Sequence, residues 1–188
     1  MKSFWEERYK RGGTSGKGSV GGYRKWKWKV IDKFVNIKDK SVLDVGCGDL
    51  SFLKKQKFAL YLGLDYSPTI IKKNREKRPD LWFECVDVIE NNIELGRFQV
   101  VLCMDLLFHI MTEDGFKNLL RNLNRWTGDY LFVVNWCKNP LSYLKDHYQH
   151  FRDLSLYFDW LTDLNLVDTF QRKKDPYNML YVFRRRSD

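Results

Sequence analysis

The chain has 188 residues, of which 44% are hydrophobic and 30% charged, and its formal net charge is +9 at pH 7. This length and apolar content suit one globular domain with a sizeable core. The sequence has no stretch of about 18 uncharged apolar residues, and residues 1–7 lack the apolar block of a secretory signal. We therefore expect a cytoplasmic protein without a membrane partner.

The first 40 residues hold most of the positive charge. They carry twelve Lys and Arg side chains against four acidic ones, which accounts for +8 of the net charge of +9. A basic face of this kind favours a polyanionic partner such as nucleic acid, because bound phosphates release their counterions. A solvated surface that keeps the protein soluble explains the same pattern.

Residues 11–22 contain six glycines, too many for the interior of a helix or strand, and predict a loop. After it, Trp26, Val30 and Phe34 recur at helical spacing, which predicts a helix over Tyr23–Phe34 that ends near Asn36. Residues 1–40 thus read as a glycine-rich basic leader and a helix, part of the same domain as residues 41–188.

From Ser41 onward, short β-like runs alternate with helical patterns, as in a parallel sheet flanked by helices. The predicted strands are Ser41–Val45, Tyr61–Asp65, Leu81–Cys85, Phe98–Met104 and Tyr130–Asn135. The predicted helices between them are Ser51–Lys57, Pro68–Lys77 and Glu113–Trp126.

The C-terminal part departs from this alternation. A helical stretch over Asp153–Leu164 precedes two further β-like runs, Leu166–Gln171 and Met179–Arg185, with a turn predicted at residues 174–177. The fold class expected is therefore α/β, with a Rossmann-like, seven-stranded, mostly parallel sheet, helices on both faces and a C-terminal antiparallel hairpin.

The four cysteines, Cys47, Cys85, Cys103 and Cys137, are widely spaced and form no C-x-x-C pair. Their spacing indicates free thiols in a reducing compartment, with no metal site and no disulfide framework.

The most informative segment is residues 42–49, an apolar strand that leads into a Gly-x-Gly turn at Gly46 and Gly48. Glycines there let a ligand approach the backbone closely. Asp44 precedes the turn and would repel a pyrophosphate, whereas it suits a cationic ligand. A dinucleotide fingerprint also requires a glycine where this chain has Ser51. The segment therefore argues against NAD and for a sulfonium amino-acid cofactor.

Acidic residues also follow the next three predicted strands. Asp65 ends the second and is suited to accept both hydroxyls of a ribose, and Asp87 after the third is suited to accept from an adenine amino group. The fourth ends in Met104-Asp105, which would close the pocket beneath the donor.

With these motifs, the chain resembles the class I S-adenosylmethionine-dependent methyltransferases over about residues 40–185. The resemblance implies S-adenosylmethionine as the cofactor, with its methionine part beside the first motif and its nucleoside beside the second and third. The implied cofactor contacts are Asp44, Gly46, Cys47, Gly48, Asp65, Tyr66, Asp87, Val88 and Met104.

The leader is similar to one seen in some small stand-alone bacterial members, where it would fold over the cofactor. That likeness makes Gly13, Thr14, Ser15 and Tyr23 candidate lid residues. A nucleoside-triphosphate loop is disfavoured, because no strand precedes the glycines and the Gly-Lys-Ser/Thr ending is missing.

His109 follows Asp105 by about one helical turn, so both are candidates for a catalytic role at the end of the fourth strand. A histidine titrates near neutral pH and can take a proton from a hydroxyl or amine acceptor. A histidine that only packs and donates a hydrogen bond beside the cofactor is the alternative.

The function expected is methyl transfer to an oxygen or nitrogen acceptor, which the sequence leaves open among small molecules, glycans and nucleic acid. A noncatalytic nucleic-acid- or protein-binding module on the same fold is the main alternative. An NAD-dependent oxidoreductase is disfavoured by Asp44, Ser51 and the predicted C-terminal strand pair.

Overall fold

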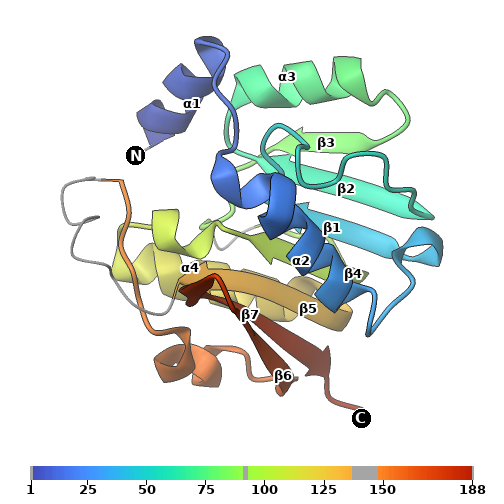
Figure 1. The fold of residues 1–188 in the computed structure, drawn as a ribbon, viewed down its shortest axis with the longest axis vertical. Helices are drawn as coiled ribbons and strands as arrows, with labels where there is room; N and C mark the ends of the chain where they lie inside the picture. The colour runs from blue at the N-terminus through green and yellow to red at the C-terminus, as the bar shows by residue number, and fades with distance from the viewer. Residues whose placement is uncertain (1, 91–92, 137–147, 188) are drawn as a thin grey trace. The chain divides into compact units, whose positions relative to one another are not determined.

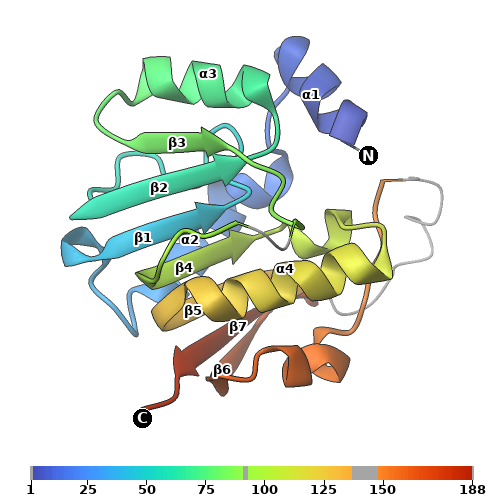
Figure 2. The same ribbon diagram turned by 180° about the vertical axis from the view of Figure 1, so that it is seen from behind.

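The structure is a computed structural model that describes residues 2–90, 93–136 and 148–187, so Cys137 lies outside the described residues. The chain divides into two compact units, residues 1–88 and residues 89–188. Figures 1 and 2 show the ribbon from two opposite sides.

The first unit is built on three parallel strands, β1 (Ser41–Val45), β2 (Leu60–Asp65) and β3 (Trp82–Cys85), in the order β3-β2-β1. Strand β1 is almost entirely buried, as expected for a parallel strand that reads as a continuous apolar run. Asp44 lies opposite Gly63, and Asp65 lies opposite Cys85. The carboxyl ends of all three strands therefore meet at one edge.

Helix α3 (Pro68–Lys77) connects β2 to β3 and lies beside them in Figure 1, with α1 (Lys2–Lys10) next to it. Ser67 caps α3, because its hydroxyl oxygen accepts a hydrogen bond from the amide of Ile70, and Pro68 occupies the first turn. Two 3-10 helices, η1 (Lys17–Ser19) and η2 (Ile37–Asp39), flank α2 (Gly21–Ile31).

Three expectations for the first unit need correction. The helix predicted over Ser51–Lys57 is wrong: the segment is a series of turns, and Lys54 has a φ of 58°, which an α-helix does not accept. The predicted loop over residues 11–22 contains η1 and the first two residues of α2, and α2 ends at Ile31 rather than near Asn36. Helix α1 was not predicted.

The second unit contains β4 (Phe98–Met104) and β5 (Thr127–Trp136), which pair in parallel, followed by β7 (Asp175–Arg185) and β6 (Leu164–Arg172), which pair antiparallel. Figure 2 shows α4 (Glu113–Trp126) lying along β4 and β5. Thr112 caps α4 through a bond from the amide of Gly115. The helix buries Phe116, Leu119, Leu120 and Leu123, as the periodicity predicted.

The last elements of the second unit differ in detail from those predicted. The predicted helix over Asp153–Leu164 is a 3-10 helix, η5 (Leu154–Trp160), followed by a turn. The hairpin turn lies at residues 173–174 rather than 174–177. Pro176 falls where the register of the β6–β7 pair shifts, and its carbonyl accepts from Gln171, so the irregularity accommodates a residue without an amide hydrogen.

The fold class predicted from the sequence is confirmed. The seven strands form a mostly parallel sheet that ends in an antiparallel hairpin, with flanking helices. Among the described residues, no helix is long and apolar enough to cross a membrane.

Candidate functional site

The site in the first unit centres on the turn that follows β1. The amides of Gly46 and Cys47 both donate to the carbonyl of Leu64 in β2, at 2.8 and 2.9 Å. Gly46 and Gly48 have φ angles of 78° and 52°, a region that favours glycine. The turn is thus fixed to the neighbouring strand.

Asp65 ties the ends of β1 and β2 together. Its Oδ2 accepts from the amide of Gly48 at 3.1 Å, and its Oδ1 accepts from the amide of Ser67 at 3.0 Å. Burial raises the pKa of Asp65 to about 6, although these backbone hydrogen bonds oppose the shift. Each carboxylate oxygen has two lone pairs, so both oxygens can accept a further hydrogen bond from a ligand hydroxyl.

Asp44 is more deeply placed, with 2% of its surface exposed. Its Oδ2 accepts from the hydroxyl of Tyr61 at 2.9 Å. Burial raises the pKa of Asp44 to about 7, the Tyr61 hydrogen bond lowers it, the charge of Asp65 raises it and the charge of Lys27 lowers it. Two neighbouring buried carboxylates are therefore present, and each is easier to ionise when a cation lies close.

The third strand end joins the same edge. The amide of Val86, just after β3, donates to the carbonyl of Asp65 at 3.0 Å, which brings the following residues beside the end of β2. Asp87 is partly exposed, and Val88 is buried. The structure therefore brings the three acids of the first unit to adjacent strand ends.

The leader packs directly onto the glycine turn. The amide of Ser15 donates to Asp49 at 3.1 Å, and the amide of Asp49 donates to the Ser15 hydroxyl oxygen at 2.7 Å. The hydroxyl of Tyr9 lies 3.2 Å from the same oxygen. A β-carbon added to Gly48 would meet the Ser15 hydroxyl oxygen at 2.1 Å, so the contact requires glycine.

The other predicted lid residues contact residues within the leader itself. Gly13 donates to the carbonyl of Arg8 at 2.8 Å, and an added β-carbon would lie 2.8 Å from that oxygen. The carbonyl of Thr14 accepts from the Arg8 guanidinium at 2.6 Å. Tyr23 lies in α2, with the ammonium of Lys17 5.8 Å from its ring centre.

Sequence reasoning missed two residues that dock α1. The carboxylate of Glu6 accepts from the hydroxyls of Ser67 and Thr69 at the start of α3, and its amide donates to the hydroxyl of Tyr66 at 3.1 Å. Burial opposes ionisation of Glu6, but these hydrogen bonds outweigh it and lower its pKa. Tyr9, buried against the turn, is the second. Neither residue belongs to a periodic pattern or a motif.

The second unit holds the remaining candidates. Met104 ends β4 and is buried, and Asp105 follows with a φ of 59°, an uncommon conformation for aspartate. His109 lies in the 3-10 helix η3 (Leu107–His109), rather than one α-helical turn after Asp105, and is 8% exposed. Its Nδ1 lies 3.2 Å from the carbonyl of Tyr148, whose ring stacks on the imidazole. A neutral ring that donates from Nδ1 keeps its lone pair on Nε2.

The donor set of the first unit suits one class of ligand. Three carboxylates at one strand edge, beside a glycine turn that lets a ligand approach the backbone, can hold a molecule that carries ammonium and hydroxyl groups. They would oppose a bare pyrophosphate through like charge.

Comparison with known proteins agrees with this chemistry. Residues 42–129 match the sequence pattern of a family described as a methyltransferase domain. The chain is 29% identical over 124 residues to a ubiquinone biosynthesis O-methyltransferase of Coxiella burnetii. That match covers 56% of this chain and 53% of the relative, so the chain spans about half the length of that protein.

Solved structures share the fold at low identity. A magnesium protoporphyrin IX methyltransferase from Synechocystis, solved with S-adenosylhomocysteine, is similar with a TM-score of 0.71 and 17% identity over 98% of this chain and 96% of that one. A 4+2 cyclase has a TM-score of 0.72 and 12% identity over 100% of this chain and 93% of its own. At such identities these likenesses establish the fold alone.

Proposed function

Because residues 42–129 match a methyltransferase domain and the chain shares the fold of a solved methyltransferase, we propose that it is an enzyme that binds S-adenosylmethionine and transfers the methyl group to an oxygen or nitrogen acceptor. The observation that carries the proposal is the set of three carboxylates at the ends of β1, β2 and β3, next to a glycine turn whose geometry is fixed by Leu64. The acceptor stays open among small molecules, glycans and nucleic acid, and we place the reaction in the cytoplasm.

Different residues of the first unit would bind different parts of the cofactor. Asp65 would hold the ribose hydroxyls through its open lone pairs, and Asp87 with Val88 would take the adenine. Asp44 would act on the ammonium of the methionine part through its field or a bridging water, because it is almost fully buried and already accepts from Tyr61. The Ser15–Asp49 contact would hold the leader over the turn and exclude water.

When bound, the cofactor supplies a methyl group on a positively charged sulfur. Positioning of the acceptor in line with that methyl would supply most of the rate enhancement. His109 and Asp105 are the groups we propose for removing the acceptor's proton where it must lose one. In His109, the nitrogen that accepts this proton would be Nε2, since Nδ1 faces the Tyr148 carbonyl.

A noncatalytic nucleic-acid- or protein-binding module remains the second candidate, and one observation favours it: residues 1–40 carry twelve Lys and Arg side chains against four acidic ones. A labelling experiment distinguishes the enzyme from the noncatalytic module. Methyl-labelled S-adenosylmethionine is incubated with the protein and with metabolite, glycan, nucleic-acid and protein fractions, and transfer of label into each fraction is measured. We expect label in one fraction, and a loss of about 10- to 100-fold in Asp65→Asn, as for lost hydrogen bonds to a charged group. The exposed Asp159→Asn serves as the matched control. Cofactor binding without label in any fraction would favour the module.

A further inference from the structure

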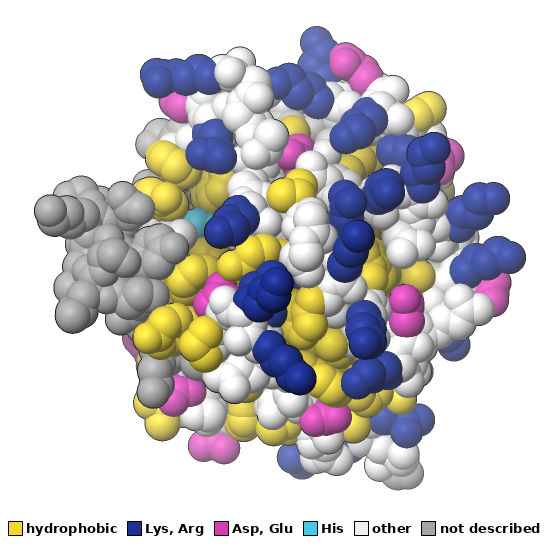
Figure 3. All heavy atoms as spheres, viewed as in Figure 1, with side chains coloured by type: hydrophobic (Ala, Val, Ile, Leu, Met, Phe, Trp, Pro, Cys, Tyr) yellow, Lys and Arg dark blue, Asp and Glu magenta, His cyan; other side chains and the backbone are white. Residues whose placement is uncertain are grey.

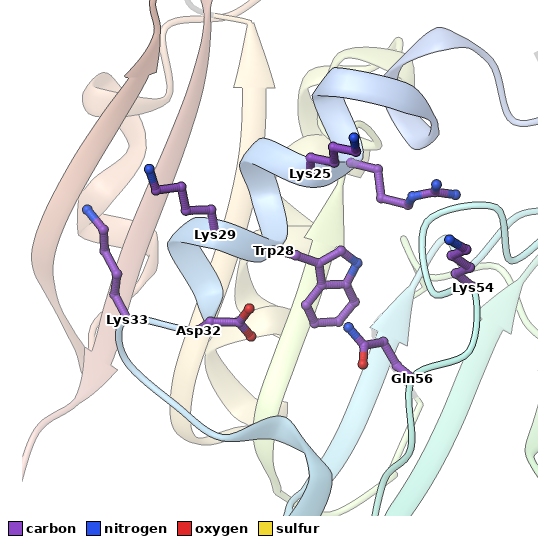
Figure 4. A pocket seen from close by; sticks show the side chains of 8 residues that line it. Lys25, Trp28, Lys29, Asp32, Lys33, Lys54 and Gln56 are labelled. Carbon is purple, nitrogen blue, oxygen red and sulfur yellow. The ribbon is translucent and has the colours of Figure 1, made fainter.

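A basic groove lies on the outer side of α2, on the first unit and away from the residues assigned above. It is lined by Arg24, Lys25, Trp28, Lys29, Asp32, Lys33, Lys54 and Gln56, and its volume is about 570 Å³. Five of these eight side chains are cationic and one is acidic. Figure 3 shows Lys and Arg side chains gathered over and beside α2 on this face, and Figure 4 shows the groove from close by.

Three of the groove's cations are not engaged within the protein. Among the described residues, the ammonium groups of Lys25, Lys29 and Lys54 make no hydrogen bond or ion pair, and all three residues are exposed. Other basic side chains of the unit are used structurally: the ammonium of Lys27 is buried and donates to Gly18, and that of Lys73 donates to Tyr9. The groove therefore concentrates positive charge that the fold itself does not use.

The cations are spread along the groove instead of converging on one point. Lys25 and Lys29 are one helical turn apart, which corresponds to a rise of about 6 Å. In Figure 4, Lys33 continues this row, and Lys54 faces α2 from the other side. A single phosphate would contact only part of such a row, whereas a chain of phosphates can follow it.

The floor of the groove is rigid and unsuited to reading bases. Trp28 is 8% exposed, its indole Nε1 donates to the carbonyl of Phe52 at 2.9 Å, and its ring stacks on Phe52 at 4.8 Å between centres. The Arg24 guanidinium donates to the carbonyl of Ser51 at 3.0 Å, which joins α2 to the opposite wall. An indole held in this way offers little surface for stacking with a base.

We propose that this groove binds the sugar-phosphate backbone of single-stranded nucleic acid, with little dependence on sequence. Side chains of α2 line one side of the groove, and Lys54 with Gln56 line the other, which fits one strand better than a double helix or a flat lipid surface. The inference does not require methyl transfer, because binding can be measured without a methyl donor. It would also hold if the acceptor of the proposed reaction were a small molecule.

Fluorescence anisotropy with a labelled single-stranded oligonucleotide, in the absence of cofactor, tests the proposal. About four phosphate contacts predict a slope near −3 in log K against log salt, so affinity falls about 50-fold from roughly 50 to 200 mM salt. The variant K25Q/K29Q/K54Q removes three contacts, and we expect its affinity to fall roughly 100-fold at about 100 mM salt, with a slope near −1.

The control K38Q/K57Q/K72Q removes the same charge from exposed lysines outside the groove and should bind as the unmodified chain does. Equal losses in the two variants would overturn the groove assignment, because they would show an effect of net charge alone. Failure of the unmodified chain to bind, or binding only to phosphatidylserine vesicles, would also overturn it. Oligonucleotides of different base composition should differ less than about tenfold, since stacking on Trp28 is prevented.

Discussion

The contact between the leader and the glycine turn makes a quantitative prediction for Gly48→Ala. The added methyl group would lie 2.1 Å from the Ser15 hydroxyl oxygen and 3.1 Å from the Tyr9 hydroxyl, so Ser15 must move away. This displacement breaks the 2.7 Å bond from the Asp49 amide, a loss of about 1–2 kcal/mol. The left-handed φ of 52° adds about 1 kcal/mol for a residue with a β-carbon.

Two further variants separate the clash from the backbone cost. Ser15→Gly alone should cost about 1–2 kcal/mol, because it leaves the Asp49 amide without its acceptor. In the Gly48→Ala background, the same change should cost almost nothing, since Ser15 has already been displaced. The double variant should therefore lose about 1–2 kcal/mol less than the sum of the two single losses, and this difference is the coupling energy.

Trypsin cleavage after the exposed Arg11 reports opening of the leader. An opening made easier by 1–2 kcal/mol should speed cleavage by about 5- to 30-fold in each single variant. The double variant should be cleaved about as fast as Gly48→Ala. If the two single effects multiply in the double variant, Ser15 and Gly48 are independent, and the packing of the leader on the turn is refuted.

Two more predictions concern the charged groups of the first unit. Asp44→Asn keeps an acceptor for Tyr61 and removes a carboxyl whose pKa of about 7 lies above the ordinary value of 3.8. As pH rises through 7, the folded protein must ionise this buried carboxyl, so the stability linked to Asp44 is complete below pH 4 and falls by up to about 4 kcal/mol at higher pH. The variant should therefore be more resistant to urea than the unmodified chain at pH 8, and the two should be equally resistant near pH 4. An equal difference at both pH values would contradict this. Glu6→Ala removes the acceptor of the Ser67 and Thr69 hydroxyls and should lower the free energy of unfolding, measured with urea, by about 1–2 kcal/mol. Its control, Glu7→Ala, loses only an exposed ion pair with Lys10 and should change that free energy by less than about 0.5 kcal/mol. Equal effects would mean that α1 does not dock through Glu6.

The sheet was predictable because its signals are local. The apolar run Ser41–Val45 ends at a glycine pair, and Pro68–Lys77 begins with a Ser-Pro cap, so both were predicted with the bounds the structure shows. The helix predicted after the glycine turn was wrong, because a lysine-rich sequence gives no indication that Lys54 adopts a left-handed conformation. Helix α1 was missed, since its stability comes from the distant contacts of Glu6 and Tyr9.

The candidate site was partly predictable for the same reason. Strand-end acids can be located from strand positions alone, which places Asp44, Asp65 and Asp87. Their partners cannot, because Tyr61 and Gly48 are 17 residues from the carboxylates they contact, and Ser15 is 34 residues from Asp49. The roles assigned to the site residues, including His109 and Asp105 as proton acceptors, stay predictions.

Calorimetric titration with S-adenosylmethionine, S-adenosylhomocysteine and NAD tests the central claim most directly. We expect micromolar binding of the first two, tighter at pH 8 than at pH 5.5, because a ligand ammonium favours the ionised forms of Asp44 and Asp65, whose pKa values are about 7 and 6. Asp65→Asn should weaken this binding about 10- to 100-fold. Binding of NAD instead, or of none of the three by protein with an intact circular dichroism spectrum, would contradict the assignment of this strand edge to a sulfonium cofactor.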